Sequence, residues 1–81
     1  MRCEILLFAQ LADVIGTDRL AISLPEGATV ADALAKVANE HEAIASVRST
    51  LAVAVNERYC SPSRGLCDGD TIALIPPVSG G

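Results

Sequence analysis

One strongly amphipathic helix is predicted near the middle of the chain, and it limits the possible folds more than any other feature. Thr29 is a typical helix N-cap, and Asp32 follows three residues later in a near capping box. The apolar residues after the cap recur at helical spacing: Val30, Ala33, Leu34, Val37 and Ala38. A helix with one apolar face has to bury that face against other elements. The strand-like segments on either side of the helix are the available partner.

Five segments typical of β-strands surround this helix. Residues 2–8 and 19–24 precede it, and residues 51–55, 58–60 and 71–75 follow it. A short helical stretch at residues 9–15, ended by Gly16, separates the first two strands. Residues 24–27 (Leu-Pro-Glu-Gly) fit a type I turn. Residues 41–50 are ambiguous, and we expect a loose helical turn and a loop there.

This order of elements predicts an α+β domain in which one main helix lies across one face of a mixed sheet of about four to five strands. It is the order of a ubiquitin-like β-grasp fold. Residues 1–81 are expected to form a single domain with an extended tail at residues 76–81.

Composition and charge exclude several classes of function. Six basic and ten acidic residues give a net charge of −4, and the chain has one Phe and one Tyr, so we expect no nucleic-acid binding. The apolar runs are far shorter than the roughly 18–20 residues of a membrane span, and the sequence starts without a leader pattern. We therefore expect a cytoplasmic protein without a membrane partner.

The cysteines and paired acids do not indicate a catalytic or metal site. Cys3, Cys60 and Cys67 are irregularly spaced and form no CxxC pair, so we interpret them as small, partly buried apolar residues and expect no metal. Asp68 and Asp70 flank a glycine, and a tight turn explains them better than acid–base chemistry.

The chain ends with an unusual tail: Pro76, Pro77, Val78, Ser79, Gly80 and Gly81. Two consecutive prolines cannot donate backbone hydrogen bonds, so the last strand has to stop before them. Two residues without side chains can enter a narrow slot in another protein. There the carboxylate of Gly81 becomes an acyl donor once ATP adenylates it, and a sulfur nucleophile can then replace the adenylate to give a thiocarboxylate. A frayed terminus without a role is the alternative, which the prolines beside the strand disfavour.

A candidate partner surface lies next to this tail. Strand alternation directs Phe8 and Ile75 away from the main helix, and Tyr59 can join them from the neighbouring short strand. Three exposed apolar side chains beside the tail are typical of an interface. The alternative is that they pack under loops.

Four segments of the sequence resemble the molybdopterin synthase small subunit, a sulfur carrier of the ubiquitin-like family. They are LLFAQLADVIGTD (6–18), LPEGATVADAL (24–34), LAVAVNE (51–57) and LCDGDTIALIPPVSGG (66–81). The ending PPVSGG is the most specific of these matches. Tyr59 differs from the aliphatic residue expected at a partner-contact position.

The resemblance implies a role in molybdenum cofactor biosynthesis. A ubiquitin-activating-enzyme-like protein would use ATP to adenylate Gly81, and a sulfur donor protein would convert it to a thiocarboxylate. The tail, with Gly80 as the slot-fitting neighbour, would then enter the large synthase subunit and donate sulfur to the pterin precursor. The implied assembly is a heterotetramer in which the catalytic side chains are on the large subunit. The chain would bind no cofactor and would not be an enzyme on its own.

Two other functions stay open. One is a sulfur carrier for another pathway, such as thiamine thiazole synthesis, with the same chemistry at Gly81. The other is a ubiquitin-fold interaction module without terminal chemistry. An independent enzyme has little support, because the sequence shows no nucleophile–base pair.

Overall fold

The computed structural model describes residues 1–77, and the predicted tail residues Val78 to Gly81 lie outside the described part. The elements in chain order are β1 (Arg2–Leu7), α1 (Gln10–Ile15), β2 (Arg19–Ser23), α2 (Val30–Glu40), α3 (Glu42–Val47), the 3₁₀ helix η1 (Arg48–Thr50), β3 (Ala52–Val55), β4 (Arg58–Tyr59) and β5 (Thr71–Ile75).

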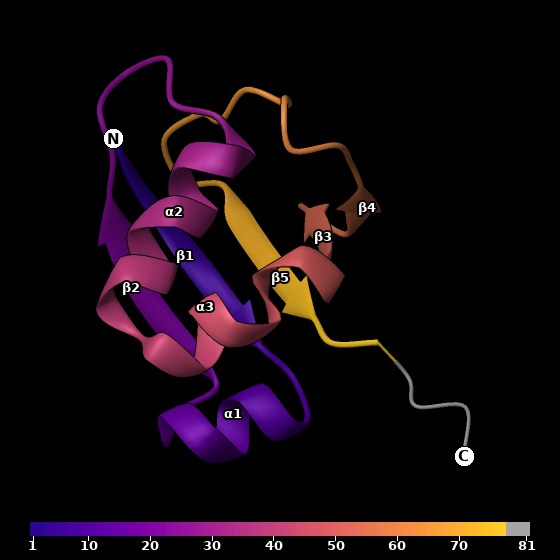
Figure 1. Ribbon diagram of the computed structural model, residues 1–81. Helices are drawn as coiled ribbons and strands as arrows, with labels where there is room; N and C mark the ends of the chain where they lie inside the picture. The colour runs from indigo at the N-terminus through magenta and orange to yellow at the C-terminus, as the bar shows by residue number, and fades with distance from the viewer. Residues whose placement is uncertain (78–81) are drawn as a thin grey trace.

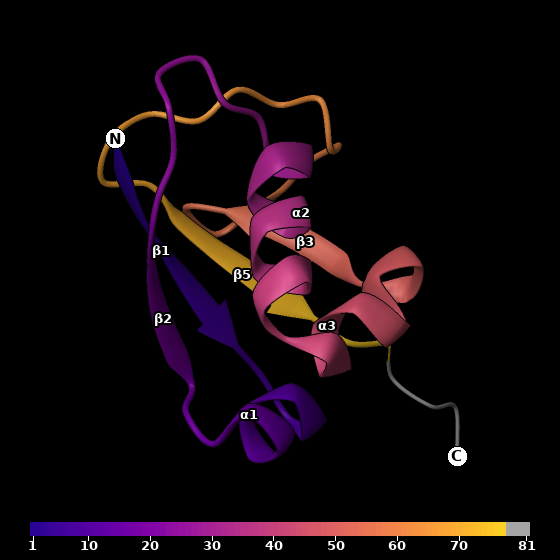
Figure 2. The same cartoon turned by 60° about the vertical axis from the view of Figure 1, so that its left-hand side comes forward.

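The strands form one mixed sheet with the order β2-β1-β5-β3-β4. β1 pairs with β5 in parallel, and the other neighbours are antiparallel. Figures 1 and 2 show α2 lying across one face of this sheet, with α3 beside the C-terminal end of α2, and with α1 where β1 ends and β2 begins. The predicted α+β architecture is confirmed, with five strands.

The core lies between α2 and the sheet. Ile5 on β1 and Ile72 and Leu74 on β5 point to this side and are fully buried, as strand alternation predicts. Val30 and Val37 meet them from α2 and are also fully buried. Among residues 1–77, no helix is long and apolar enough to cross a bilayer.

The start of α2 is fixed by the predicted capping box. The backbone N–H of Asp32 donates to the Thr29 hydroxyl (3.4 Å), and the Thr29 N–H donates to the Asp32 carboxylate (2.9 Å). The turn before it differs from the prediction. The Ala28 N–H donates to the Pro25 carbonyl (3.2 Å), and Gly27 has φ 84°, so the turn is centred one residue later than the predicted type I turn. A positive φ at the third position is the requirement of a type II turn, which glycine meets without strain.

The helical turn expected within residues 41–50 is confirmed, but the loop expected beside it is wrong. The chain forms α3 and η1 there, and Ile44 is fully buried against the core. α3 contacts both α2 and α1. A helix of six residues is too short to be stable alone, so this tertiary packing stabilises it.

Candidate functional site

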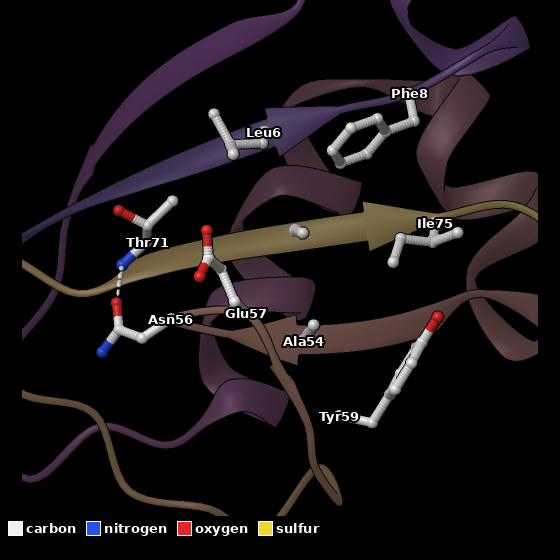
Figure 3. A pocket seen from close by; sticks show the side chains of 9 residues that line it. Leu6, Phe8, Ala54, Asn56, Glu57, Tyr59, Thr71 and Ile75 are labelled. Atoms are coloured by element: carbon white, nitrogen blue, oxygen red, sulfur yellow. Dashed lines mark hydrogen bonds between the residues drawn. The ribbon is translucent and has the colours of Figure 1, made fainter.

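The face of the sheet opposite α2 carries the predicted partner residues. One row across the sheet is set by strand register: Leu6 lies next to Ala73, Ala73 next to Ala54, and Ala54 next to Tyr59. Because the two central residues of the row are alanines, the larger side chains at its ends stand above them. The result is an open-face hollow of about 540 Å³, which Figure 3 shows from close by.

Phe8, Tyr59 and Ile75 meet at one end of this hollow, where β5 ends at Ile75 (Figure 3). Phe8 is 45% exposed and Tyr59 is 74% exposed, while Ile75 is half-buried. In residues 1–77, no loop buries the aromatic rings of Phe8 and Tyr59 to the extent expected for core side chains. The geometry therefore matches the predicted exposed apolar patch and not the alternative of packing under loops.

The other end of the hollow is polar and is held by Asn56. Its side-chain oxygen accepts the Thr71 N–H (3.1 Å), the contact drawn in Figure 3, and its amide donates to Asp70 (2.9 Å). Asn56 and Glu57 have φ values of 50° and 72°, as a two-residue type I′ hairpin turn requires. These contacts fix the β3–β4 hairpin against β5 and so place Tyr59 at the edge of the hollow.

Asp70 and Asp68 organise turns, as the sequence indicated. Asp70 accepts the Cys67 N–H (2.8 Å), and Asp68 accepts the Arg2 N–H (2.7 Å). Hydrogen bonds from the Cys67 backbone and the Asn56 side chain hold the pKa of Asp70 below its usual range. In residues 1–77 no group of three or more His, Cys, Asp or Glu side chains is arranged to hold a metal ion.

The three thiols have different environments. Cys3 is buried, and burial together with the nearby Asp70 charge raises the pKa of its thiol. Cys60 is partly buried. Cys67 is exposed, so the prediction of a partly buried residue was wrong for this position, because Cys67 begins the turn that closes at Asp70.

The chain leaves the sheet beside the apolar end of the hollow. Ile75 is the last residue of β5 and pairs with Ala52, and Pro76 and Pro77 follow outside the strand. The predicted stop before the two prolines is confirmed. The predicted roles of Val78, Ser79, Gly80 and Gly81 concern residues outside the described part of the chain.

Six of the nine residues that line the hollow were not singled out as site residues from sequence, and three of these six, Leu6, Ala54 and Ala73, belong to the row across the sheet. The alternation that placed Phe8 and Ile75 on the open face also places Leu6 and Ala73 there. Ala54 could not be found in this way, because every residue from Val53 to Val55 is buried and its strand shows no alternation.

A β-grasp sheet with one helix-covered face and one exposed apolar face, next to the exit of the chain, defines a ubiquitin-like protein. Comparison with solved structures agrees. The crystal structure of SAMP1 from Haloferax volcanii superposes with a TM-score of 0.89 at 32% identity and covers 100% of both chains. A chain in the complex of subunits 1 and 2 of the molybdopterin-converting factor from Helicobacter pylori gives a TM-score of 0.73 at 27% identity, again with 100% of both chains.

The chain belongs to the ThiS family, whose model matches residues 5–81. It is 39% identical to the molybdopterin synthase sulfur carrier subunit of Chlamydomonas reinhardtii, over 100% of both sequences. It is 34% identical to the subunit of the same name from Escherichia coli K12, over 96% of this chain and 98% of that protein. The resemblance found in the sequence is therefore confirmed over the full length of the chain.

Proposed function

We propose that this protein is a sulfur carrier for molybdopterin synthesis and that Gly81 carries the sulfur. The observation that carries the proposal is the apolar end of the open-face hollow, which lies at the exit of a tail ending in two glycines. Full-length similarity to subunits that are named as sulfur carriers of molybdopterin synthase supports the pathway.

The chemistry takes place at the terminal carboxylate. An oxygen of Gly81 attacks the α-phosphorus of ATP, pyrophosphate leaves, and an acyl adenylate forms. A hydrosulfide equivalent from a sulfur donor protein then attacks the acyl carbon and displaces AMP, which gives the thiocarboxylate. ATP is bound by the activating protein, so the carrier itself needs no cofactor.

The body of the carrier supplies recognition. Phe8, Tyr59 and Ile75 offer an apolar surface on which a partner can settle while the tail enters its active site. We propose that the large synthase subunit and the activating protein both use this surface. A complex of two subunits is known for the similar Helicobacter pylori protein, and a heterotetramer is the assembly we propose here.

Intact-mass measurement tests the chemistry. The chain is incubated with ATP, a ubiquitin-activating-enzyme-like protein and a sulfur source, and an exchange of one oxygen for sulfur at residue 81 is expected. A variant that lacks Gly81 and a variant extended by one residue beyond it should gain no sulfur. Sulfur elsewhere in the chain, or no exchange with an activating protein that is active on another carrier, would contradict the proposal.

Binding measurements test the surface separately. Tyr59→Ala should weaken binding of the large subunit by about tenfold or more, because aromatic residues at the centre of an interface often contribute more than about 1–2 kcal/mol. Val14→Ala is the matched control, because Val14 is 66% exposed on α1, which does not contribute to the hollow. Equal affinities for the two variants would contradict the assigned surface.

A second candidate function is that of a protein modifier. It is favoured by the similarity to small archaeal modifier protein 1 of Haloferax volcanii, which is 34% identical over 93% of this chain and 95% of that protein. An activated Gly81 could acylate a lysine amine on another protein. Covalent conjugates of higher mass in cells, absent when Gly81 is deleted, would support this function, and co-purification with a pterin-binding large subunit would favour the sulfur carrier.

A further inference from the structure

A second concavity lies on the helix-covered side of the sheet, at the edge formed by β3 and β4. This edge hollow has a volume of about 610 Å³. It is bounded by α2, α3, η1 and the loop after β4, and its lining includes Leu34, Ala45, Arg48, Ser49, Tyr59 and Pro62. Tyr59 also lines the open-face hollow, so the two concavities meet at its ring.

The edge hollow has fixed walls. The first backbone N–H groups of α2 bind the loop after β4: the Val30 N–H donates to the Arg64 carbonyl and the Ala31 N–H to the Pro62 carbonyl, both at 2.9 Å. Helix N-termini leave such groups without partners inside the helix, so these bonds hold the loop firmly. β4 has two residues and pairs only with Ala54 and Val55 of β3. Residues of the loop after β4 and of η1 both line the edge hollow.

The chemistry of the edge hollow is apolar with one positive charge. Leu34 is buried at 6% exposure and lies at its base, whereas Ala45 and Ser49 are small, exposed residues at its rim. Arg48 is the charged residue of the lining, and among residues 1–77 it takes part in none of the ion pairs, which join Arg19, Lys36 and Arg64 to acids. Although the chain as a whole has a net charge of −4, the guanidinium of Arg48 makes this site locally favourable for a carboxylate.

The position of the edge hollow connects it to the tail. Ile75 pairs with Ala52, which lines the edge hollow, while the side chain of Ile75 lines the open-face hollow. The chain therefore leaves β5 between the two concavities. A protein that holds the tail and covers Tyr59 reaches the edge hollow without crossing any other element.

We propose that the edge hollow receives an apolar side chain flanked by a carboxylate from the large synthase subunit. Recognition then extends from the open face around the β3–β4 edge, with Tyr59 at the centre. The inference rests on the proposed function, because it requires a partner that takes the tail. The activating protein is the other occupant that the test distinguishes.

Two substitutions test the edge hollow. Ser49→Trp fills it from the rim, and Arg48→Gln removes its charge while keeping a side chain of similar length. Ser49→Trp should weaken binding of the purified large subunit by about tenfold or more, and Arg48→Gln by about threefold, with the second effect decreasing at high salt. Each test substitution has a control of the same kind. Ala21→Trp, on the opposite edge strand β2, is the control for Ser49→Trp, and Arg2→Gln, at the start of β1, is the control for Arg48→Gln. Both controls should change the affinity for the large subunit less than twofold.

The binding results for these variants separate a failure of this inference from a failure of the proposed function. Wild-type affinity in both Ser49→Trp and Arg48→Gln overturns this inference and leaves the proposed function intact. Weakened binding of the activating protein alone also overturns it, because the occupant would then be that protein. No binding of the large subunit by the wild-type chain overturns the proposed function and this inference together. Urea unfolding of each variant shows whether a loss of binding reflects the surface or the fold, and Arg48→Gln remains decisive if Ser49→Trp is unstable.

Discussion

Replacement of Ile44 by alanine tests whether α3 is an integral part of the core. Ile44 is fully buried in a six-residue helix that contacts both α1 and α2. Nothing local stabilises a helix of this length, so the burial of its one core side chain has to do so. The substitution removes three carbons from the core and leaves a cavity that the neighbouring helices cannot fully close.

The expected loss is large for a domain of this size. Truncation of a buried isoleucine to alanine costs about 2–5 kcal/mol, and about 3 kcal/mol is a central value. At about 0.05–0.15 kcal/mol per residue, the whole domain is stable by only about 4–12 kcal/mol. One kcal/mol changes the Tm of such a domain by about 4–8 °C, so the Tm should fall by about 12–24 °C.

Urea and thermal unfolding followed by circular dichroism measure this change. Val14→Ala is the control, because Val14 also lies in a six-residue helix but is 66% exposed. That substitution should change the free energy of unfolding by less than about 0.5 kcal/mol. If Ile44→Ala is as mild as the control, α3 is not packed against the core in solution, and the reasoning fails.

Three further substitutions test individual contacts. Thr29→Ala removes the acceptor of the capping box and should lower the free energy of urea unfolding by about 1 kcal/mol; no change would refute the role of the cap. Ala9 has φ 51° and ψ −127°, a conformation that costs a residue with a Cβ atom about 1–3 kcal/mol. Ala9→Gly should therefore raise the free energy of unfolding by about 1 kcal/mol, once the extra conformational entropy of glycine in the unfolded chain is subtracted. A lower free energy of unfolding would contradict backbone strain at this position. The lowered pKa of Asp70 means that its ionised form adds stability above its usual pKa of about 4, and this stability is lost as the pH falls through the lowered value. The difference in free energy of unfolding between wild type and Asp70→Asn should therefore be largest at about pH 7 and should shrink as the pH is lowered below about 4, and a difference that stays constant over this range would refute the effect.

Local patterns predicted most elements of the fold correctly. Alternation of apolar residues located the strands at both ends of the chain, and the capping box fixed the start of α2. These signals depend on neighbours within a few residues, so sequence is sufficient to find them. The turn before α2 was predicted one residue too early, because proline and glycine at this spacing fit more than one turn type. The hydrogen bond from the Ala28 N–H to the Pro25 carbonyl shows which turn forms.

Elements that depend on contacts between distant parts of the chain could not be predicted from sequence. Ile44 and the rest of α3 have no strong local pattern, and their helix forms because α1 and α2 cover it. The exposure of Cys67 is different, because the turn that Asp70 closes spans only three residues and is a local feature.

For the candidate site, the sequence alone determined the chemical components: the tail with its prolines and terminal glycines, and the outward direction of Phe8 and Ile75. The physical reason is that proline, glycine and the two-residue period of a strand act locally. Only the tertiary structure decided that two alanines from different strands form the base of the hollow and that Tyr59 separates it from a second one. Those relations depend on strand register and on the parallel pairing of β1 with β5, which join residues from opposite ends of the chain.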